Sequence, residues 1–89
     1  MANYPTNRRI IEILLRCGFN HVNEFKSAPH FVLCREHKGL KFRAIISKNL
    51  NKVPPYGTFC AIVSKSGLPK EIYLMKNKEI KKYFEIHDI

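Results

Sequence analysis

The sequence lacks the features that would assign it to a membrane, a secretory route or a disulfide scaffold. No apolar run is long enough to cross a bilayer, because the longest, from Ile10 to Leu15, is interrupted by Glu12. The amino-terminal residues show neither the apolar stretch nor the cleavage site of a secretory signal. The cysteines are odd in number, lie far apart and form no Cys-x-x-Cys pair: Cys17, Cys34 and Cys60. We therefore expect a cytoplasmic protein with reduced thiols and no contact with a membrane.

Acidic residues are almost absent from the middle of the chain. Between Lys26 and Lys70 there are nine basic residues and a single acid, Glu36, so this segment carries +8 of the formal charge of +9. A charge excess confined to one region predicts a surface that binds an anionic partner. The basic residues are dispersed and form no polybasic helix, which favours nucleic acid over anionic lipid. An aromatic signature of base stacking is missing, so contacts with the nucleic-acid backbone are expected.

The chain is long enough for one domain and too short for two. The chain has 89 residues, of which 45% are apolar, enough for a compact core. We see no internal repeat and no low-complexity tract. The prediction is a single domain over residues 1–89, with a core at about 7–75 and an extension at 76–89.

Capping residues and periodicity predict the elements of this domain. Thr6 begins a helix over residues 7–17 that ends at Gly18. Strands are expected at about 19–25, 30–36 and 40–47, with a hairpin turn at 37–39. After a proline-containing loop, Thr58 is expected to cap a helix over 59–66 that Gly67 ends.

Two further helices are expected in the carboxy-terminal part, one over 69–75 and a last one that Asn77 caps. The fold class that follows is α+β, in the order α-β-β-β-α. A three-stranded antiparallel sheet is covered on one face by helices, and the last helix forms a carboxy-terminal extension.

The alternation within the strands predicts which side chains share a face. Phe31 and Leu33 lie on one face of their strand, so His30 points to the opposite face. In the next strand Lys41 and Arg43 alternate with apolar residues in the same way. If the apolar face packs under the helices, His30, Lys41 and Arg43 share the open side of the sheet.

The order of these motifs resembles the HicA family of bacterial toxin–antitoxin systems. Members have a first helix that ends in Gly-Phe, a strand with a Gly-Ser-His motif, and a Gly-Thr that starts a helix ending in Gly-Leu. This chain has Gly18-Phe19, then Ala28-Pro29-His30-Phe31-Val32-Leu33, and then a segment from Gly57-Thr58 to Gly67-Leu68. Ala28 and Pro29 stand where the family has Gly-Ser. The resemblance covers about residues 8–75.

The resemblance implies a double-stranded-RNA-binding-domain-like fold and an mRNA-cleaving toxin that needs no metal or other cofactor. His30 matches the family's catalytic histidine, whose imidazole moves a proton at the RNA backbone. A HicB-like antitoxin would be the protein partner and mRNA the substrate. Dispersed basic residues would bind the RNA backbone: Lys26, Arg35, Lys38, Lys41, Arg43 and Lys48.

Other interpretations of the same residues remain open. His30 can be an ordinary surface histidine without chemistry. A zinc site of His30, Cys34 and His37 is disfavoured, because alternation places His37 on the other face and no fourth ligand is apparent. The chain can also be a non-enzymatic module, encoded by a phage or mobile element, that binds RNA or a ribonucleoprotein.

Overall fold

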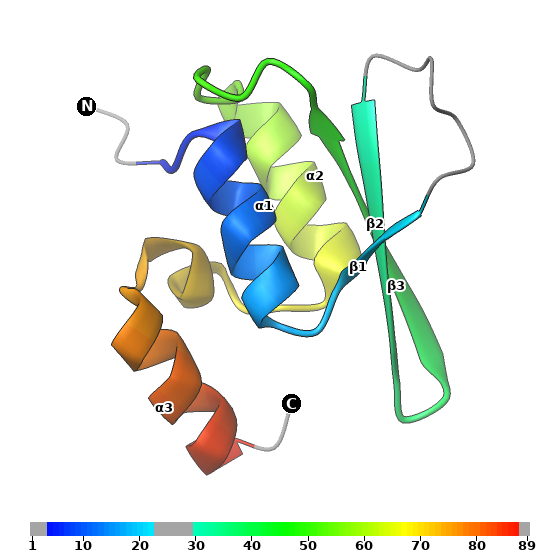
Figure 1. Ribbon diagram of the computed structural model, residues 1–89, viewed down its shortest axis with the longest axis vertical. Coiled ribbons are helices and arrows are strands. Elements are labelled where there is room, and N and C mark those ends of the chain that lie inside the picture. Colours follow the sequence, from blue (N-terminus) through cyan, green and yellow to red (C-terminus); the bar gives the residue numbers. More distant parts are fainter. Residues whose placement is uncertain (1–3, 23–29, 88–89) are drawn as a thin grey trace.

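The fold is a three-stranded sheet with helices on one of its faces (Figure 1). The computed structural model describes residues 4–22 and 30–87. The elements are α1 (Asn7–Arg16), β1 (Asn20–Val22), β2 (His30–His37), β3 (Leu40–Ser47), α2 (Tyr56–Ser66), the 3-10 helix η1 (Lys70–Leu74) and α3 (Asn77–His87). The predicted α+β class, element order and one-sided helical cover are confirmed.

The sheet has the order β1-β2-β3, with both pairs antiparallel. Two residues, Lys38 and Gly39, connect β2 to β3, and both have positive φ, 51° and 79°. This is the backbone of a type I′ turn, whose twist matches the twist of the strands beside it. The predicted hairpin is therefore confirmed with its turn at Lys38 and Gly39, whereas His37, predicted within the turn, is the last residue of β2.

The apolar faces of the strands meet the helices. Leu33 is fully buried and lies opposite Ala44, and Phe31 lies opposite the buried Ile46. α1 and α2 both pack on this side of the sheet, and each contacts β3. Buried residues of α1, α2 and η1 complete one continuous core, which Ile80 of α3 also joins. The carboxy-terminal extension is thus packed onto the domain.

The first helix has the predicted ends. The Thr6 hydroxyl accepts a hydrogen bond from the backbone N–H of Arg9 at 3.3 Å, and Gly18 has a positive φ of 93° just after the helix. The first predicted strand, in contrast, is described only as Asn20–Val22, and residues 23–25 lie outside the described ranges.

The prediction for α2 was wrong at its start and right at its end. The helix begins at Tyr56, and Pro55 occupies the N-cap position without a side-chain cap. Thr58 therefore lies inside the first turn. Proline is compatible with this position because its fixed φ, here −56°, suits the start of a helix, and its carbonyl oxygen accepts the first helical hydrogen bond, from the N–H of Phe59, at 2.9 Å. Gly67 ends the helix in the left-handed conformation, as predicted.

The two carboxy-terminal predictions are corrected in detail. The segment after Pro69 is a 3-10 helix, Lys70–Leu74, and not an α-helix. Asn77 was expected to cap the last helix, but Lys76 accepts the first helical hydrogen bond, from Ile80, at 3.0 Å. The Asn77 side chain instead accepts a hydrogen bond from Arg9 Nη1 at 2.8 Å. This contact joins α1 to the start of α3.

Candidate functional site

His30 is the first residue of β2, and its side chain lies on the uncovered face of the sheet. Its partner position on β3 is Ser47, and both lie on the side opposite the buried Ile46. The His30 side chain is exposed. The predicted orientation of His30 toward the open side is therefore confirmed.

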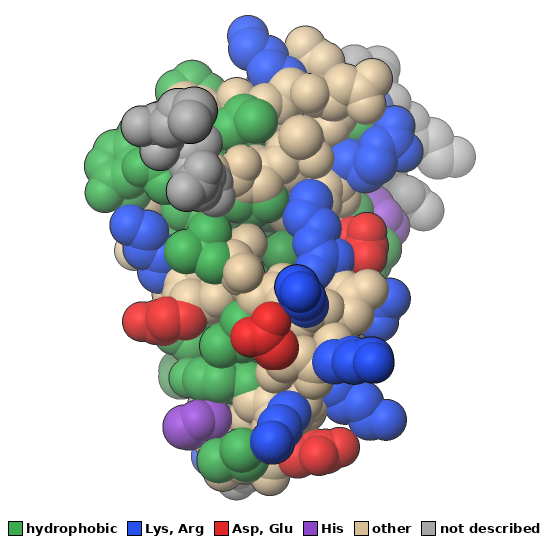
Figure 2. Space-filling model, turned by 90° about the vertical axis from the view of Figure 1, so that its left-hand side faces the viewer, with side chains coloured by type: hydrophobic (Ala, Val, Ile, Leu, Met, Phe, Trp, Pro, Cys, Tyr) green, Lys and Arg blue, Asp and Glu red, His purple; other side chains and the backbone are tan. Residues whose placement is uncertain are grey.

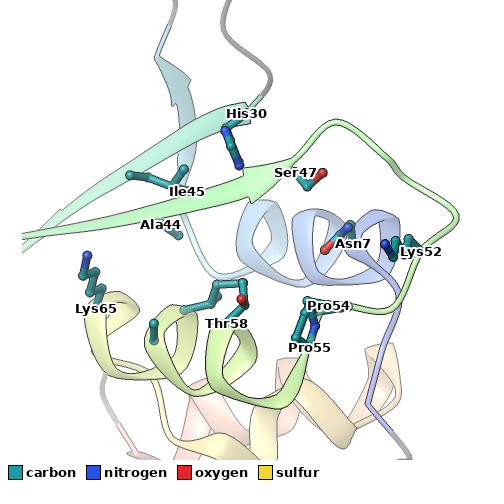
Figure 3. Close-up of a pocket in the computed structure, with 12 residues that line it drawn as sticks. Asn7, His30, Ala44, Ile45, Ser47, Lys52, Pro54, Pro55, Thr58 and Lys65 are labelled. Carbon is teal, nitrogen blue, oxygen red and sulfur yellow. The ribbon is translucent and has the colours of Figure 1, made fainter.

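A groove of about 390 Å³ runs from His30 between β3 and α2 (Figure 3). Its apolar part is formed by Ala44 and Ile45 of β3 and Ile62 of α2. Its hydroxyl groups come from Ser47 and Thr58. One side of the groove is thus the sheet and the other the helix, and the imidazole lies at its sheet side.

Two lysines also line this groove, Lys52 from the loop after β3 and Lys65 from the last turn of α2. Both are exposed, and no acidic side chain is among the described residues that line the groove. The formal charge of the lining is therefore positive. An anionic group that enters the groove meets two ammonium groups together with the imidazole of His30.

The start of α1 holds the loop that carries Lys52. The buried Asn7 donates its side-chain amide to the Asn49 carbonyl oxygen at 3.0 Å, and its backbone N–H donates to the Lys52 carbonyl oxygen at 2.9 Å. The N–H of Arg8 donates to the Leu50 carbonyl oxygen at 3.0 Å. The backbone at Lys52 is therefore fixed by hydrogen bonds to a helix terminus. The four amino-terminal N–H groups of a helix have no partner within it, which is why α1 can supply these donors.

Lys52 and Lys65 were not among the site residues predicted from the sequence. They are 13 positions apart in the sequence and lie on different elements, so no local pattern joins them to His30. The one local signal was the pair Pro54-Pro55, which predicts a loop after β3 but not where that loop packs. Packing of α2 against β3 brings the two lysines to one groove.

Lys41 and Arg43 lie on the same open face as His30, as predicted. Their partner positions on β2 are Glu36 and Cys34, which alternate with the buried side of the strand. Arg43 is four residues from Ser47 along β3, a separation of about 13 Å at the usual rise per residue. These two side chains therefore extend the basic surface away from the groove along the sheet.

The structure does not bring all the predicted RNA-binding residues together. Arg35 lies on the helix-covered face, where its guanidinium stands 5.6 Å from the centre of the Phe84 ring. Lys38 is at the hairpin turn, at the far end of β2 from His30. Lys48 follows β3, and its Nζ lies 5.4 Å from the centre of the Phe31 ring. Lys26 lies outside the described residues.

Acidic side chains are distributed unevenly between the sheet and the helices. Among the described acidic residues, Glu36 lies on the sheet and the others lie on helices: Glu12, Glu71, Glu79 and Glu85. Figure 2 shows a helical side of the molecule, where acidic side chains are interspersed with Lys and Arg. Within the described residues the sheet thus carries a single acid, in line with the scarcity of acids in the middle of the sequence.

The other predicted chemistry concerns metals and thiols. Within residues 4–22 and 30–87, no group of three or more His, Cys, Asp or Glu side chains is placed to hold a metal ion. Cys17 is buried, and Cys34 and Cys60 are partly buried; none of the three forms a disulfide. Burial raises the pKa of the Cys17 thiol to about 11, although nearby Arg35 lowers it somewhat. Cys17 is thus an unreactive core residue.

No helix within the described ranges is long and apolar enough to cross a bilayer. Comparison with known proteins adds no relative: no family model, no curated protein and no solved structure matches this chain. The geometry around His30 is therefore the basis for a functional proposal.

Proposed function

We propose that this protein is an endoribonuclease toxin that cleaves mRNA without a metal ion, with His30 as its general acid and base. The observation that carries the proposal is the position of His30 in a groove whose only charged side chains among the described residues are lysines, Lys52 and Lys65. The formal charge of +9 adds long-range attraction for a polyanion. The motif resemblance supports the same role for His30.

The proposed reaction is an internal transfer at an RNA phosphate. The imidazole of His30 accepts the proton of a 2′-hydroxyl, whose oxygen attacks the adjacent phosphorus. The bond from phosphorus to the 5′-oxygen breaks, and the imidazolium returns the proton to that leaving oxygen. The products are a 2′,3′-cyclic phosphate and a 5′-hydroxyl, so no water or cofactor is consumed.

The lysines would act on the charge that gathers on the phosphate oxygens. Ammonium groups that flank the groove stabilise the more negative transition state more than the ground state. Ser47 and Thr58 can donate hydrogen bonds to the same oxygens. Lys41 and Arg43, farther along the open face, would bind neighbouring phosphates and hold the strand in register.

The resemblance also implies the partner, a HicB-like antitoxin that silences the toxin. A basic groove and open sheet face would favour a partner with an acidic surface. Induced expression in bacteria tests the whole proposal. The parent chain should arrest growth and deplete mRNA, whereas the His30→Ala chain, expressed at the same level, should do neither. Healthy cells with intact mRNA in both cultures would contradict the toxin assignment.

A second candidate function is a non-enzymatic RNA-binding module. It is favoured by one observation: apart from His30 and the two lysines, the described lining of the groove has no titratable side chain. Ribonucleases that use separate acid and base groups have a second titratable side chain in the groove that binds the reacting phosphate. Tight binding of RNA that remains intact after prolonged incubation would select this alternative.

A further inference from the structure

The outer edge of β3 borders the groove and presents backbone N–H and C=O groups to it. β3 is the last strand of the sheet, and within the described residues no strand pairs with its outer side. In a hairpin with a two-residue turn, the pair that flanks the turn exchanges hydrogen bonds, and the bonded pairs then alternate. Here that pair is His37 and Leu40. The N–H and C=O groups of Ile45 and Ser47 therefore point away from β2.

These outward groups are available for pairing. No backbone hydrogen bond between described residues outside the regular elements engages Ile45 or Ser47. Both residues line the groove, where α2 lies alongside and leaves space (Figure 3). A strand added to the edge of a sheet lies about 4.8 Å from its neighbour. Such a strand would run along the groove.

The groove also specifies the side chains of an added strand. Alternate side chains would point into the apolar part formed by Ala44, Ala61 and Ile62. The other side chains would lie on the open face beside Ile45, which is 43% exposed. Lys52 and Lys65 flank this path, with no acid among the described lining residues. A matching segment therefore alternates apolar and acidic residues.

We propose that the outer edge of β3 binds an extended acidic peptide segment of a partner protein by strand addition. Main-chain hydrogen bonds to Ile45 and Ser47 supply affinity, and the groove and its lysines select the sequence. A second copy of this chain fits poorly, because two edges with the same excess of lysine repel each other. The pairing requires no RNA and no chemistry at His30, so it can be tested apart from the proposed ribonuclease.

The test uses a short synthetic peptide of alternating Glu and Val as the probe. On binding, the amide protons of Ile45 and Ser47 should shift in NMR spectra and exchange more slowly with solvent. Reversal of charge at the groove, Lys52→Glu with Lys65→Glu, should weaken binding at least about tenfold. The matched control reverses two exposed lysines of α3, Lys78→Glu with Lys82→Glu, and should leave affinity nearly unchanged.

Backbone pairing has its own control. Two versions of the peptide carry N-methyl groups on alternate residues, one set on Val and the other on Glu. Only one edge of the peptide can face β3, so one version should lose binding and the other should retain it. The variant Ile45→Pro, which removes an outward N–H while leaving the bonds to β2, should also lose binding.

Three results would overturn the proposal. The first is equal binding of both N-methylated peptides. The second is equal loss of affinity in the groove and α3 double variants. The third is an oligoribonucleotide that shifts and protects the Ile45 and Ser47 amides while the peptide does not, which would make the edge an RNA site.

Discussion

The ring of Phe42 lies directly against the backbone of Gly67, so β3 approaches the end of α2 where a larger residue cannot fit. A Cβ added to Gly67 would lie 2.6 Å from Cδ1 of Phe42, and Gly67 has a φ of 71°. Both the backbone conformation and the close approach therefore require glycine. This contact fixes the end of α2 against the sheet and so helps to define the groove between them.

Gly67→Ala should lower the free energy of unfolding by about 2–4 kcal/mol, since it combines a left-handed non-glycine residue with overpacking. Gly39→Ala is the matched control, because Gly39 also has a positive φ, 79°, but no atom near the position of a Cβ. It should cost about 1 kcal/mol. Chemical denaturation measures both values; equal losses would contradict the role assigned to Phe42.

Arg9 connects α1 to the start of α3. Its Nη1 donates to Glu12 at 2.7 Å and to Asn77 at 2.8 Å, and its Nη2 donates to the Met75 carbonyl oxygen at 3.0 Å. Arg9→Met should cost about 1–2 kcal/mol and speed amide hydrogen exchange most strongly in α3.

The control for Arg9 is Arg16→Met, which removes an exposed ion pair with Glu12 at 3.6 Å. Such a pair contributes little, so less than about 0.5 kcal/mol should be lost. Uniformly faster exchange over the whole domain in Arg9→Met would show that Arg9 does not act on α3 specifically.

Stability should fall at alkaline pH because of Cys17. Burial raises the pKa of its thiol from an ordinary value of 9.0 to about 11. The folded protein thus retains a proton that the unfolded chain releases, so the stabilisation is complete below pH 9 and is lost as pH rises toward 11. By pH 10 the loss should be about 1 kcal/mol. Denaturation curves at pH 8 and pH 10 measure this loss.

Cys17→Ala removes this titration and is the control. Tyr73, whose pKa burial raises from an ordinary value of 10.0 to about 12, contributes a smaller loss than Cys17 between pH 8 and pH 10. The variant should therefore show a markedly smaller change between pH 8 and pH 10, although its stability at neutral pH is lower. The same pH dependence in Cys17→Ala would contradict the assignment to this thiol.

Neutralising the open face should weaken RNA binding in a salt-dependent way. Lys41→Gln with Arg43→Gln removes two cationic side chains, and the slope of log affinity against log salt for a single strand should become less steep by about 1.4. Lys78→Gln with Lys82→Gln, on α3, should leave the slope close to that of the parent. Fluorescence anisotropy with a labelled oligoribonucleotide measures both; an unchanged slope in the first variant would exclude the open face as the RNA surface.

The sequence was sufficient for features that depend on local pattern. The alternation of Phe31 and Leu33 with His30, Val32 and Cys34 placed His30 on the open face, since strand geometry has a period of two residues. Thr6 indicated the start of a helix because its hydroxyl can accept a hydrogen bond from a free N–H of the first turn. Gly67 indicated the end of a helix because glycine readily adopts the left-handed conformation found there. The start of α2 predicted from Thr58 was wrong, because a threonine two positions inside a helix cannot be distinguished by sequence from a threonine that caps it.

The groove could not be predicted, since it depends on packing between segments distant in the sequence. Lys52 reaches it through hydrogen bonds between its loop and Asn7, and Lys65 through the packing of α2 on β3. Arg35 is a different case, because it has the parity of Phe31 and Leu33. The alternation that placed His30 on the open face therefore already places Arg35 on the covered face.

The most direct test of the proposed ribonuclease is cleavage of a defined RNA by purified protein in the presence of EDTA. The parent should produce fragments that end in a 2′,3′-cyclic phosphate, and a substrate with deoxyribose at the cleavage site should resist. His30→Ala should fold normally, as judged by circular dichroism, and lose at least about a hundredfold in rate. If His30→Ala cleaves RNA as fast as the parent, the proposed role of His30 is wrong.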